Sequence, residues 1–457
     1  MTDMISGDLH QNLYQPRRKA RATQSVPDAD RRAFLKVAMA QGIAAPVALA
    51  ALQCPAIAQE APIARPAGLP PRKGAMRHSV GDRAELHAAG AIVRDFADPQ
   101  LELLRLLREA AEIEHALMLQ YLFAAFSLRE DYHELAGHGA VTSDNLLGVA
   151  IQEMQHLSAV NQLLVALGSC PHLDRQDFPY EPDIYPFAFQ LESMSRASLA
   201  KFVFCEAPSD MFDLSVTKSP KDEAFRQRVI AQFGGRGRPN HIGSLYRSVL
   251  DMLEEVSKQP DAPITLEAAA EWRATLEDIM EEGEDDHFKF FRSAFEASHD
   301  AFKVATVEDV WGLPATDAAF PSYPLAPNPT AFIGHPNQLE SAPALVLAWL
   351  GNLHYWTTLS TLDYGYRTND SEAISLATMQ MMMNIWPIAT QMPSLGSGLP
   401  FDPLSMGYAL GSNPDHSKRL IKCFARETQE FARSIEHRLP SDYDPDATSE
   451  LITYLSA

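Results

Sequence analysis

Apolar residues recur at alternating steps of three and four positions over several long stretches of the chain, the spacing of one face of an α-helix. These stretches predict long helices at about 97–128, 144–168, 242–256 and 265–297. A short helix is expected to stop near Pro208. Further helical segments are expected near 340–364, 370–386 and 416–437. The pattern therefore predicts an all-α protein.

The helices fall into two groups separated by a Pro-rich stretch. We expect a helical bundle at 97–300, a Pro-rich linker at 301–339 and an additional C-terminal helical region at 340–457. The sequence does not decide whether the last region is a lid, an interface or a separate domain.

Two of the long helices carry the same polar motif on an otherwise apolar stripe. Glu153-Met-Gln-His156 lies in the second long helix, and Glu284-Asp-Asp-His287 lies in the last one of the bundle. Residues three apart share one face of a helix, so each motif presents a carboxylate and an imidazole to the same point. Because a buried charge is costly without compensation, a bound cation would explain why both pairs lie where apolar residues belong.

Two further helices contribute single carboxylates. Glu114 lies on the stripe of the first long helix, and Glu206 lies on that of the short helix before Pro208. Tyr121 and Tyr246 are candidate catalytic residues that would line the site as hydrogen-bond donors or one-electron donors. The alternative for both tyrosines is ordinary bundle packing with a tethered hydroxyl.

Together these side chains make the donor set of a dinuclear metal centre. Carboxylates hold and bridge divalent ions, and an imidazole completes the shell of each ion while positions stay open for dioxygen. The predicted ligands are Glu114, Glu153, His156, Glu206, Glu284 and His287. The alternative is a set of satisfied ion pairs in the core, which the repetition of the motif on two buried stripes makes the weaker interpretation.

Five segments of the bundle region resemble a known family. They are E-I-E-H-A-L-M-L-Q-Y-L-F-A, Q-E-M-Q-H-L, F-V-F-C-E-A-P, H-I-G-S-L-Y-R and E-G-E-D-D-H-F-K-F. They are similar to the ferritin-like superfamily and, more narrowly, to the bacterial ferritin-like family that includes the iminophenyl-pyruvate dimer synthase domain of violacein-type indole biosynthesis. The resemblance implies a ferritin-like four-helix bundle, Glu114 as the first-helix ligand, a pair of iron ions (alternatively manganese), and oxidative chemistry on amino-acid-derived imines.

One position departs from the family pattern. In H-I-G-S-L-Y-R, Ser244 stands where we expect the family to carry Glu. If that Glu is the third-helix ligand, either Glu206 substitutes for it or one metal subsite is weakened or lost.

The first 58 residues are predicted to be an export signal. Arg31-Arg32 with Phe34-Leu35, followed by an Ala-rich apolar run, resembles the twin-arginine signal, although Asp30 stands where that signal usually has Ser or Thr. The resemblance implies the twin-arginine translocase as a partner and a periplasmic or secreted location. The apolar run is too short for a stable membrane anchor. The alternative is an N-terminal helix with a chance arginine pair, and residues 59–96 are predicted to be a flexible lead.

The charge balance narrows the range of partners. The chain has 38 basic and 59 acidic residues and a formal net charge of -21, which argues against a nucleic-acid-binding or anionic-membrane surface. The cysteines at 170, 205 and 423 are scattered and indicate neither a disulfide framework nor a zinc cluster.

These inferences predict an exported dimetal-carboxylate oxidase or oxygenase that uses dioxygen on a small organic, amino-acid-derived substrate. Two alternatives stay open. One is a manganese-catalase-like or iron-handling protein, and the other is a ferritin-like binding or structural module that has lost redox activity. A homo-oligomer is compatible with each.

Overall fold

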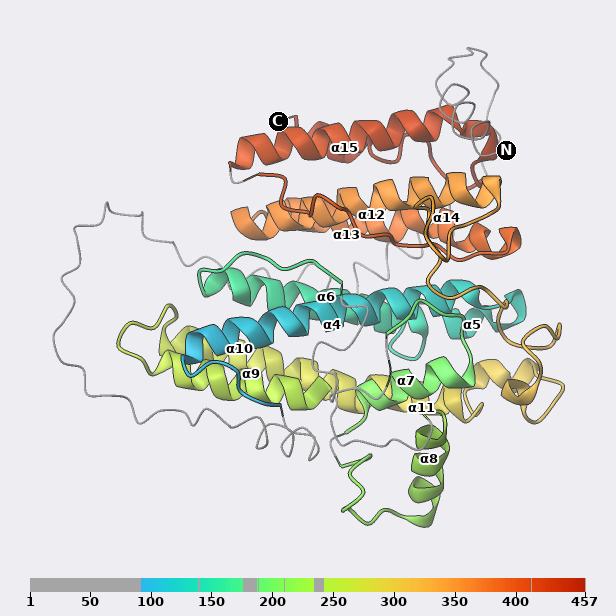
Figure 1. Cartoon of the computed structure of the whole chain (residues 1–457), viewed down its shortest axis with the longest axis horizontal. Coiled ribbons are helices and arrows are strands. Elements are labelled where there is room, and N and C mark those ends of the chain that lie inside the picture. Colours follow the sequence, from blue (N-terminus) through green and yellow to red (C-terminus); the bar gives the residue numbers. More distant parts are fainter. Residues whose placement is uncertain are drawn as a thin grey trace.

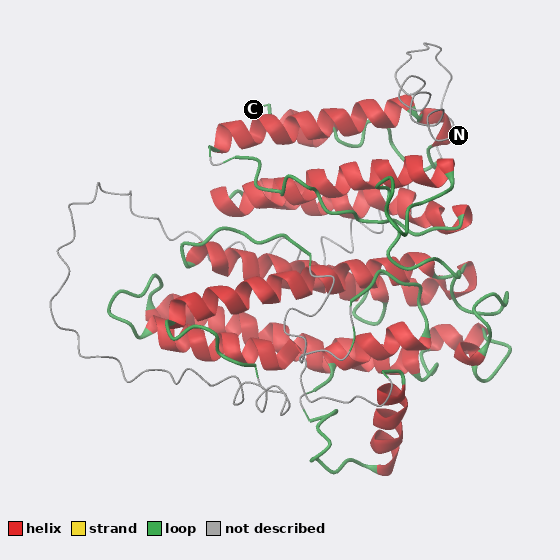
Figure 2. Cartoon of the chain, viewed as in Figure 1, coloured by secondary structure: helices red, strands yellow, loops and turns green. Residues whose placement is uncertain are grey.

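The computed structural model describes residues 92–456, except 139, 176–186, 188, 209, 234–241 and 412. In this part of the chain every extended regular element is a helix, which confirms the predicted all-α fold (Figure 2). The predicted export signal at 1–58 and nearly all of the lead at 59–96 lie outside the described residues. Among the helices that the structure describes, none is long and apolar enough to cross a membrane.

The helices stack in layers, with α4 and α6 in the middle (Figure 1). α4 (Pro99–Ser127) packs along α6 (Leu146–Ala166) on one side and along α9 (Ile242–Ser257) on another. α9 in turn packs against α10 (Leu266–Glu281). These four helices begin within two residues of the positions that the apolar spacing predicts.

The third and fourth helices of the bundle are both interrupted. α7 (Arg196–Glu206) and α9 lie in the same layer but are separated along the chain by α8 (Pro220–Ala231) and its connections (Figure 1). α10 continues through η3, a π-helical turn (Glu282–His287), into α11 (Phe288–Phe295), against which α7 packs. The bundle therefore has a break in one helix beside a widened turn in the next.

Side chains at the starts of the two central helices fix where those helices begin. The Asp98 carboxylate accepts hydrogen bonds from the backbone N–H groups of Gln100 and Leu101, both at 3.0 Å. The Asn145 side chain accepts one from the N–H of Gly148 at 3.0 Å. Such caps satisfy backbone donors that the first turn of a helix leaves unpaired, and so they set the register of the residues that follow.

The C-terminal region forms further helical layers over α4 and α6 (Figure 1). Its long helix α12 (Ala342–Thr368) is buried over most of its length and packs against α13 (Ser371–Gln380) and α15 (Pro414–Ser434). A single buried hydrophobic cluster includes residues of both the bundle and α12. The Tyr355 hydroxyl of α12 also lies 2.8 Å from Nε2 of the buried His115 on α4. The remaining helical elements are η2 (Glu130–Tyr132), α5 (His133–Ala136), η4 (Asp300–Val304), η5 (Val310–Gly312), η6 (Met381–Ile385), α14 (Trp386–Gln391), η7 (Met392–Leu395), η8 (Glu436–Arg438) and α16 (Ser449–Tyr454).

The Pro-rich segment between the two helical regions is held against the rest of the chain. The Trp311 indole N–H donates to the Ala294 carbonyl at 3.0 Å, and the Ser322 hydroxyl donates to the Met194 carbonyl at 2.7 Å. The segment thus wraps over the bundle on its way to α12.

Candidate metal centre

Buried carboxylates and imidazoles meet in the interior of the bundle. Each of them is at most 4% exposed, although glutamate is mostly found at the surface and histidine is intermediate. They come from α4, α6, the last residue of α7 and the last residue of η3. The residues are Glu114, Glu153, His156, Glu206 and His287.

Among the described residues these side chains form two donor groups that share Glu153. The first group is Glu114, Glu153 and His156, and the second is Glu153, Glu206 and His287; within each, the ligand atoms lie within 4.8 Å of one another. Glu153 Oε2 is 3.0 Å from Nδ1 of His156, and Glu153 Oε1 is 3.1 Å from Nδ1 of His287. The two oxygens of one carboxylate therefore face two different imidazoles, which is the arrangement of a bridging ligand.

Each donor group also contains one carboxylate that the other group lacks, Glu114 in the first and Glu206 in the second, here called the outer carboxylates. Glu114 Oε2 is 3.7 Å from Nδ1 of His156, and Glu206 Oε2 is 3.5 Å from Nδ1 of His287. Each histidine Nδ1 thus faces one oxygen of the shared Glu153 and one oxygen of an outer glutamate.

The electrostatics of the cluster show why it suits cations. Burial and the nearby Glu153 carboxylate raise the pKa of Glu114 to about 8. Burial lowers the pKa of His287, but the carboxylates of Glu153 and Glu206 outweigh it and raise that pKa to about 10. Burial also raises the pKa of Glu153, but His156 and His287 outweigh it, and that pKa falls well below the ordinary value. The cluster therefore retains protons in the absence of another positive charge, and divalent cations would replace them.

His287 provides a direct test of fit. Its Nδ1 is buried and lies 3.1 Å from Glu153 Oε1 and 3.5 Å from Glu206 Oε2, but within the described part of the chain neither contact has the alignment of a hydrogen bond. A buried nitrogen without a hydrogen-bond partner is costly in a folded protein. A metal ion bound at this nitrogen would remove the cost, so the residues present fit a pair of divalent ions held by oxygen and imidazole donors.

Both predicted tyrosines hold a carboxylate of the cluster. The Tyr121 hydroxyl donates to Glu206 Oε1, and the Tyr246 hydroxyl donates to Glu114 Oε1 at 2.5 Å. Burial, together with these carboxylates, raises the pKa of each phenol well above its ordinary value. Because each tyrosine occupies Oε1, the Oε2 atom of the same glutamate is left to face a histidine. The structure thus gives both residues a positioning role, and one-electron transfer by either stays a prediction.

Glu284 does not join the cluster, in contrast to its predicted role as a ligand. Neither donor group found among the described residues includes it. Its carboxylate lies 3.2 Å from Nη2 of Arg247, and its side chain is 30% exposed. Glu284 and His287 are three apart within the π-helical turn η3, which has more residues per turn than an α-helix. Residues three apart therefore do not share a face there as they do on an α-helix. Glu284 lines the pocket outside the two donor groups, and its role as a metal ligand stays a prediction.

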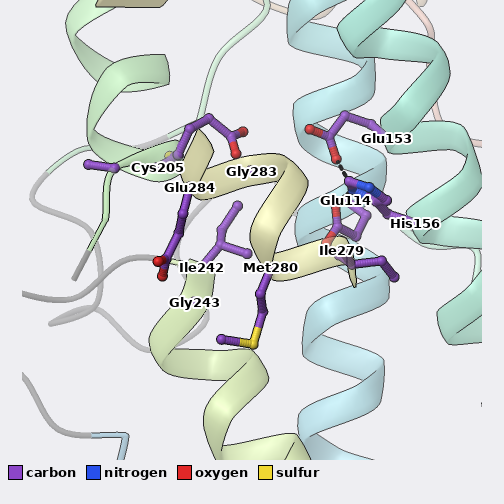
Figure 3. A pocket seen from close by; sticks show the side chains of 12 residues that line it. Glu114, Glu153, His156, Cys205, Ile242, Gly243, Ile279, Met280, Gly283 and Glu284 are labelled. Carbon is purple, nitrogen blue, oxygen red and sulfur yellow. Dashed lines mark hydrogen bonds and ion pairs between the residues drawn. The ribbon is translucent and has the colours of Figure 1, made fainter. Parts of the chain in front are cut away.

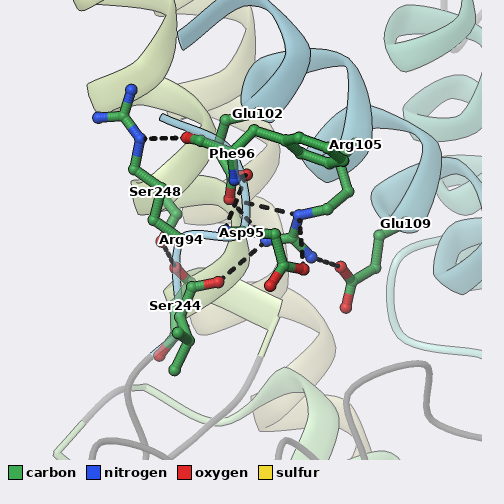
Figure 4. A network of polar contacts seen from close by, with 9 residues as sticks. Arg94, Asp95, Phe96, Glu102, Arg105, Glu109, Ser244 and Ser248 are labelled. Carbon is green, nitrogen blue, oxygen red and sulfur yellow. Dashed lines mark hydrogen bonds and ion pairs between the residues drawn. The ribbon is translucent and has the colours of Figure 1, made fainter. Parts of the chain in front are cut away.

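Ser244 is not among the residues that line the pocket beside the donor groups. It is half-buried near the start of α9. Its neighbour Gly243 lines the pocket, and Tyr246 reaches Glu114. Figure 4 shows Ser244 and Ser248 beside a polar network around Arg105. Of the two possibilities raised by Ser244, the geometry favours the one in which Glu206 supplies the carboxylate.

A small, partly open pocket adjoins the first donor group. It lies where α7 ends and α9 begins, opposite η3. One wall carries Glu114, Glu153 and His156, and the other carries apolar side chains, including Ile242 and Met280 (Figure 3). A small molecule in this pocket would contact both the metal ligands and an apolar surface.

Two residues that the sequence reasoning missed complete the surroundings of the histidines. Glu282 lies 2.9 Å from Nε2 of His156, and Gln152 lies 3.2 Å from Nε2 of His287. Both are partly exposed, and neither occupies an apolar stripe. No interruption of the hydrophobic pattern therefore marked them.

A helical bundle whose interior holds two carboxylate–histidine groups that share one glutamate has the architecture of the dimetal carboxylate proteins. Residues 107–301 match the family model described as Ferritin-like. This part of the chain is a ferritin-like domain, and the resemblance inferred from its motifs is confirmed.

Two curated proteins are similar to the chain. Dichlorochromopyrrolate synthase of Lentzea aerocolonigenes is 26% identical over 400 residues, which cover 73% of this chain and 39% of that protein. The 2-imino-3-(indol-3-yl)propanoate dimerase of Chromobacterium violaceum is 31% identical over 174 residues, which cover 30% of this chain and 17% of that protein. The chain thus spans well under half the length of either relative. The comparison with solved structures gave no significant match.

Proposed function

We propose that this protein is a dimetal-carboxylate oxidase or oxygenase that holds a pair of iron ions, or alternatively manganese ions, and acts with dioxygen on a small amino-acid-derived substrate. The observation that carries the proposal is the position of Glu153 between two donor groups, one of which forms the wall of a pocket. The similarity to a chromopyrrolate synthase and an imino-acid dimerase supports the substrate class.

The residues of the proposed site have two different roles, metal binding and the orientation of the ligands. Glu114, Glu206 and the shared Glu153 would hold the ions together with the Nδ1 atoms of the two histidines. When bound, the metals supply redox chemistry with dioxygen. Tyr121 and Tyr246 keep the outer carboxylates oriented.

The apolar wall of the pocket has a third role, which is to exclude water and to contact the substrate. Ile242, Ile279 and Met280 would exclude water from the ions and contact the hydrocarbon or aromatic part of a substrate. The half-exposed ion pair of Arg247 and Glu284 borders the same wall through Glu284.

The test is dioxygen uptake by the iron-loaded full chain. Indole-3-pyruvate or phenylpyruvate mixed with an ammonium salt provides the corresponding imino acid in equilibrium. We expect uptake that depends on the keto acid and on ammonium together, with an oxidised product detectable by mass spectrometry. The Glu153→Gln variant should lower the rate by at least about tenfold, because it disrupts both metal subsites.

Other outcomes of this experiment assign other functions. Rapid disproportionation of hydrogen peroxide without imino-acid oxidation would indicate a manganese-catalase-like protein. Protein that binds no metal would indicate a helical binding module. Either result would overturn the oxidase proposal.

We also propose that the twin-arginine translocase exports the protein, on the strength of Arg31-Arg32 and the apolar run after them. The full chain, expressed in a bacterium with this translocase, should accumulate in the periplasmic fraction. Conservative replacement of both arginines by lysine should retain it in the cytoplasm, because the receptor reads the arginine pair and not its charge alone. Equal export of the two proteins would contradict the proposal.

A further inference from the structure

The ring nitrogens of the two histidines that face away from the metal site meet one pair of side chains. Nε2 of His156 lies 2.9 Å from Glu282 Oε2. Gln152 Nε2 donates to Glu282 Oε1 at 2.8 Å, and Gln152 Oε1 lies 3.2 Å from Nε2 of His287. Gln152 and Glu282 thus join the two imidazoles in one continuous chain of hydrogen bonds between α6 and η3.

The chemistry of these groups fixes the direction of every bond in the chain. A carboxylate only accepts hydrogen bonds, so both His156 and Gln152 must donate to Glu282. Gln152 makes that bond with its amide nitrogen, so it presents its oxygen to His287, which must also donate. Both imidazoles therefore carry a hydrogen on Nε2. Nδ1 of His156 also lies 3.0 Å from Glu153 Oε2 and donates to it as long as it holds a proton. When a metal ion replaces the proton on Nδ1, the lone pair of each neutral ring is on Nδ1, the atom that faces Glu153.

We propose that Gln152 and Glu282 are positioning residues that fix the tautomer of both ligand histidines, so that one hydrogen-bond chain prepares both metal subsites. The inference rests on the proposed dimetal centre and assigns to it two residues that bind no metal themselves. Hydrogen bonds of this kind, from the far nitrogen of a metal-bound histidine, commonly contribute about 10–100-fold to metal affinity.

The directions of these hydrogen bonds predict a specific effect of the isosteric substitution Glu282→Gln. The new amide can offer its oxygen to only one side. If the oxygen accepts from His156, the new NH₂ group faces Gln152, whose amide must turn over and present its own NH₂ group to His287. If the amide is reversed, the NH₂ group faces His156. In either case one histidine must accept at Nε2, which places its hydrogen on Nδ1 and weakens it as a ligand.

Exchanging the residues at positions 152 and 282 restores the continuous series of hydrogen bonds. In the double variant Gln152→Glu, Glu282→Gln, the carboxylate at position 152 accepts from both His287 and the new amide. The amide oxygen at position 282 then accepts from His156. Both histidines again donate from Nε2, so both subsites should recover. A role in packing alone would not produce this rescue.

The experiment is anaerobic titration of the metal-free full-length protein with Fe²⁺. Isothermal titration calorimetry measures the affinity, and elemental analysis after gel filtration measures the number of ions bound. Wild-type protein should bind about two ions per chain, as a dimetal centre requires. Glu282→Gln should bind about one tightly, with the second weakened by about 10–100-fold. The double variant should return to two. Glu281→Gln, an exposed neighbour, is the matched control and should behave as wild type.

A second variant keeps the test independent of any folding defect in Glu282→Gln. Gln152→Leu removes the acceptor of His287 but leaves the bond from His156 to Glu282, so it should weaken one subsite. Gln155→Leu, exposed on the same helix, is its control. Two ions bound with wild-type affinity by Glu282→Gln or by Gln152→Leu would overturn the inference and leave the proposed function intact. A wild-type chain that binds no metal would instead overturn the proposed function.

Discussion

Replacing Glu153 with glutamine is expected to remove both metal ions at once, whereas replacing either outer glutamate is expected to remove only one. Glu153 belongs to both donor groups, and its two oxygens lie 3.0 and 3.1 Å from Nδ1 of His156 and His287. Glu114 and Glu206 each belong to one group. Bound iron or manganese should therefore fall from about two ions per chain to nearly none in Glu153→Gln, and to about one in Glu114→Gln.

Elemental mass spectrometry on protein purified in parallel measures this difference. Glu281→Gln, exposed on the fourth helix, controls for loss of a carboxylate as such. The glutamine retains the shape of the glutamate, so we expect the metal-free variant to keep its helical circular dichroism. A folded Glu153→Gln protein that still bound one ion tightly would show that Glu153 is not shared.

The apolar spacing predicted the parts of the site that lie on ordinary α-helices. Glu114, Glu153 and His156 occupy positions of a regular 3.6-residue period, and burial at those positions is fixed by the same period that fixes their apolar neighbours. A polar side chain on such a stripe is conspicuous in the sequence. For these three residues the predicted and observed positions coincide.

The spacing could not reveal where the helix itself changes. Residues three apart do not share a face in a π-helical turn, so at Glu282–His287 the α-helical spacing does not locate Glu284 relative to His287. The sequence pattern did not indicate Glu282 and Gln152 either, for a different reason. Both lie at the partly exposed edge of the site, where a glutamate or glutamine is unremarkable, and only the fold brings them to the histidines.

The sequence pattern also did not predict the helix α8 or the layering of the C-terminal region, because both depend on long-range contacts. Ser219 before Pro220 is a helix-start signal of the usual kind, but its weakly amphipathic helix carries little periodic pattern. The bond between His115 and Tyr355 joins residues 240 positions apart. No local pattern predicts such a pair.

Glu206→Ala is expected to lose one of the two metal ions, whereas Glu284→Ala is expected to keep both. Glu206 is 4% exposed, is held by Tyr121 and faces His287. Glu284 lines the same pocket but is 30% exposed and pairs with Arg247. The loss at the Glu206 subsite should exceed the roughly 10–100-fold that follows from removing only an outer hydrogen-bond partner, because a ligand itself is removed.

The pair of variants decides between the observed and the predicted ligand sets, and it is measured by Fe²⁺ titration of the two proteins side by side. Since each variant removes one carboxylate from the same pocket, the loss of charge is matched and only its position differs. If Glu284→Ala lost an ion while Glu206→Ala kept both, the π-helical turn would have to rewind when metal binds. Glu284 would then leave Arg247 for the metal, and the arrangement with Glu284 and His287 on one face would be the metal-bound one.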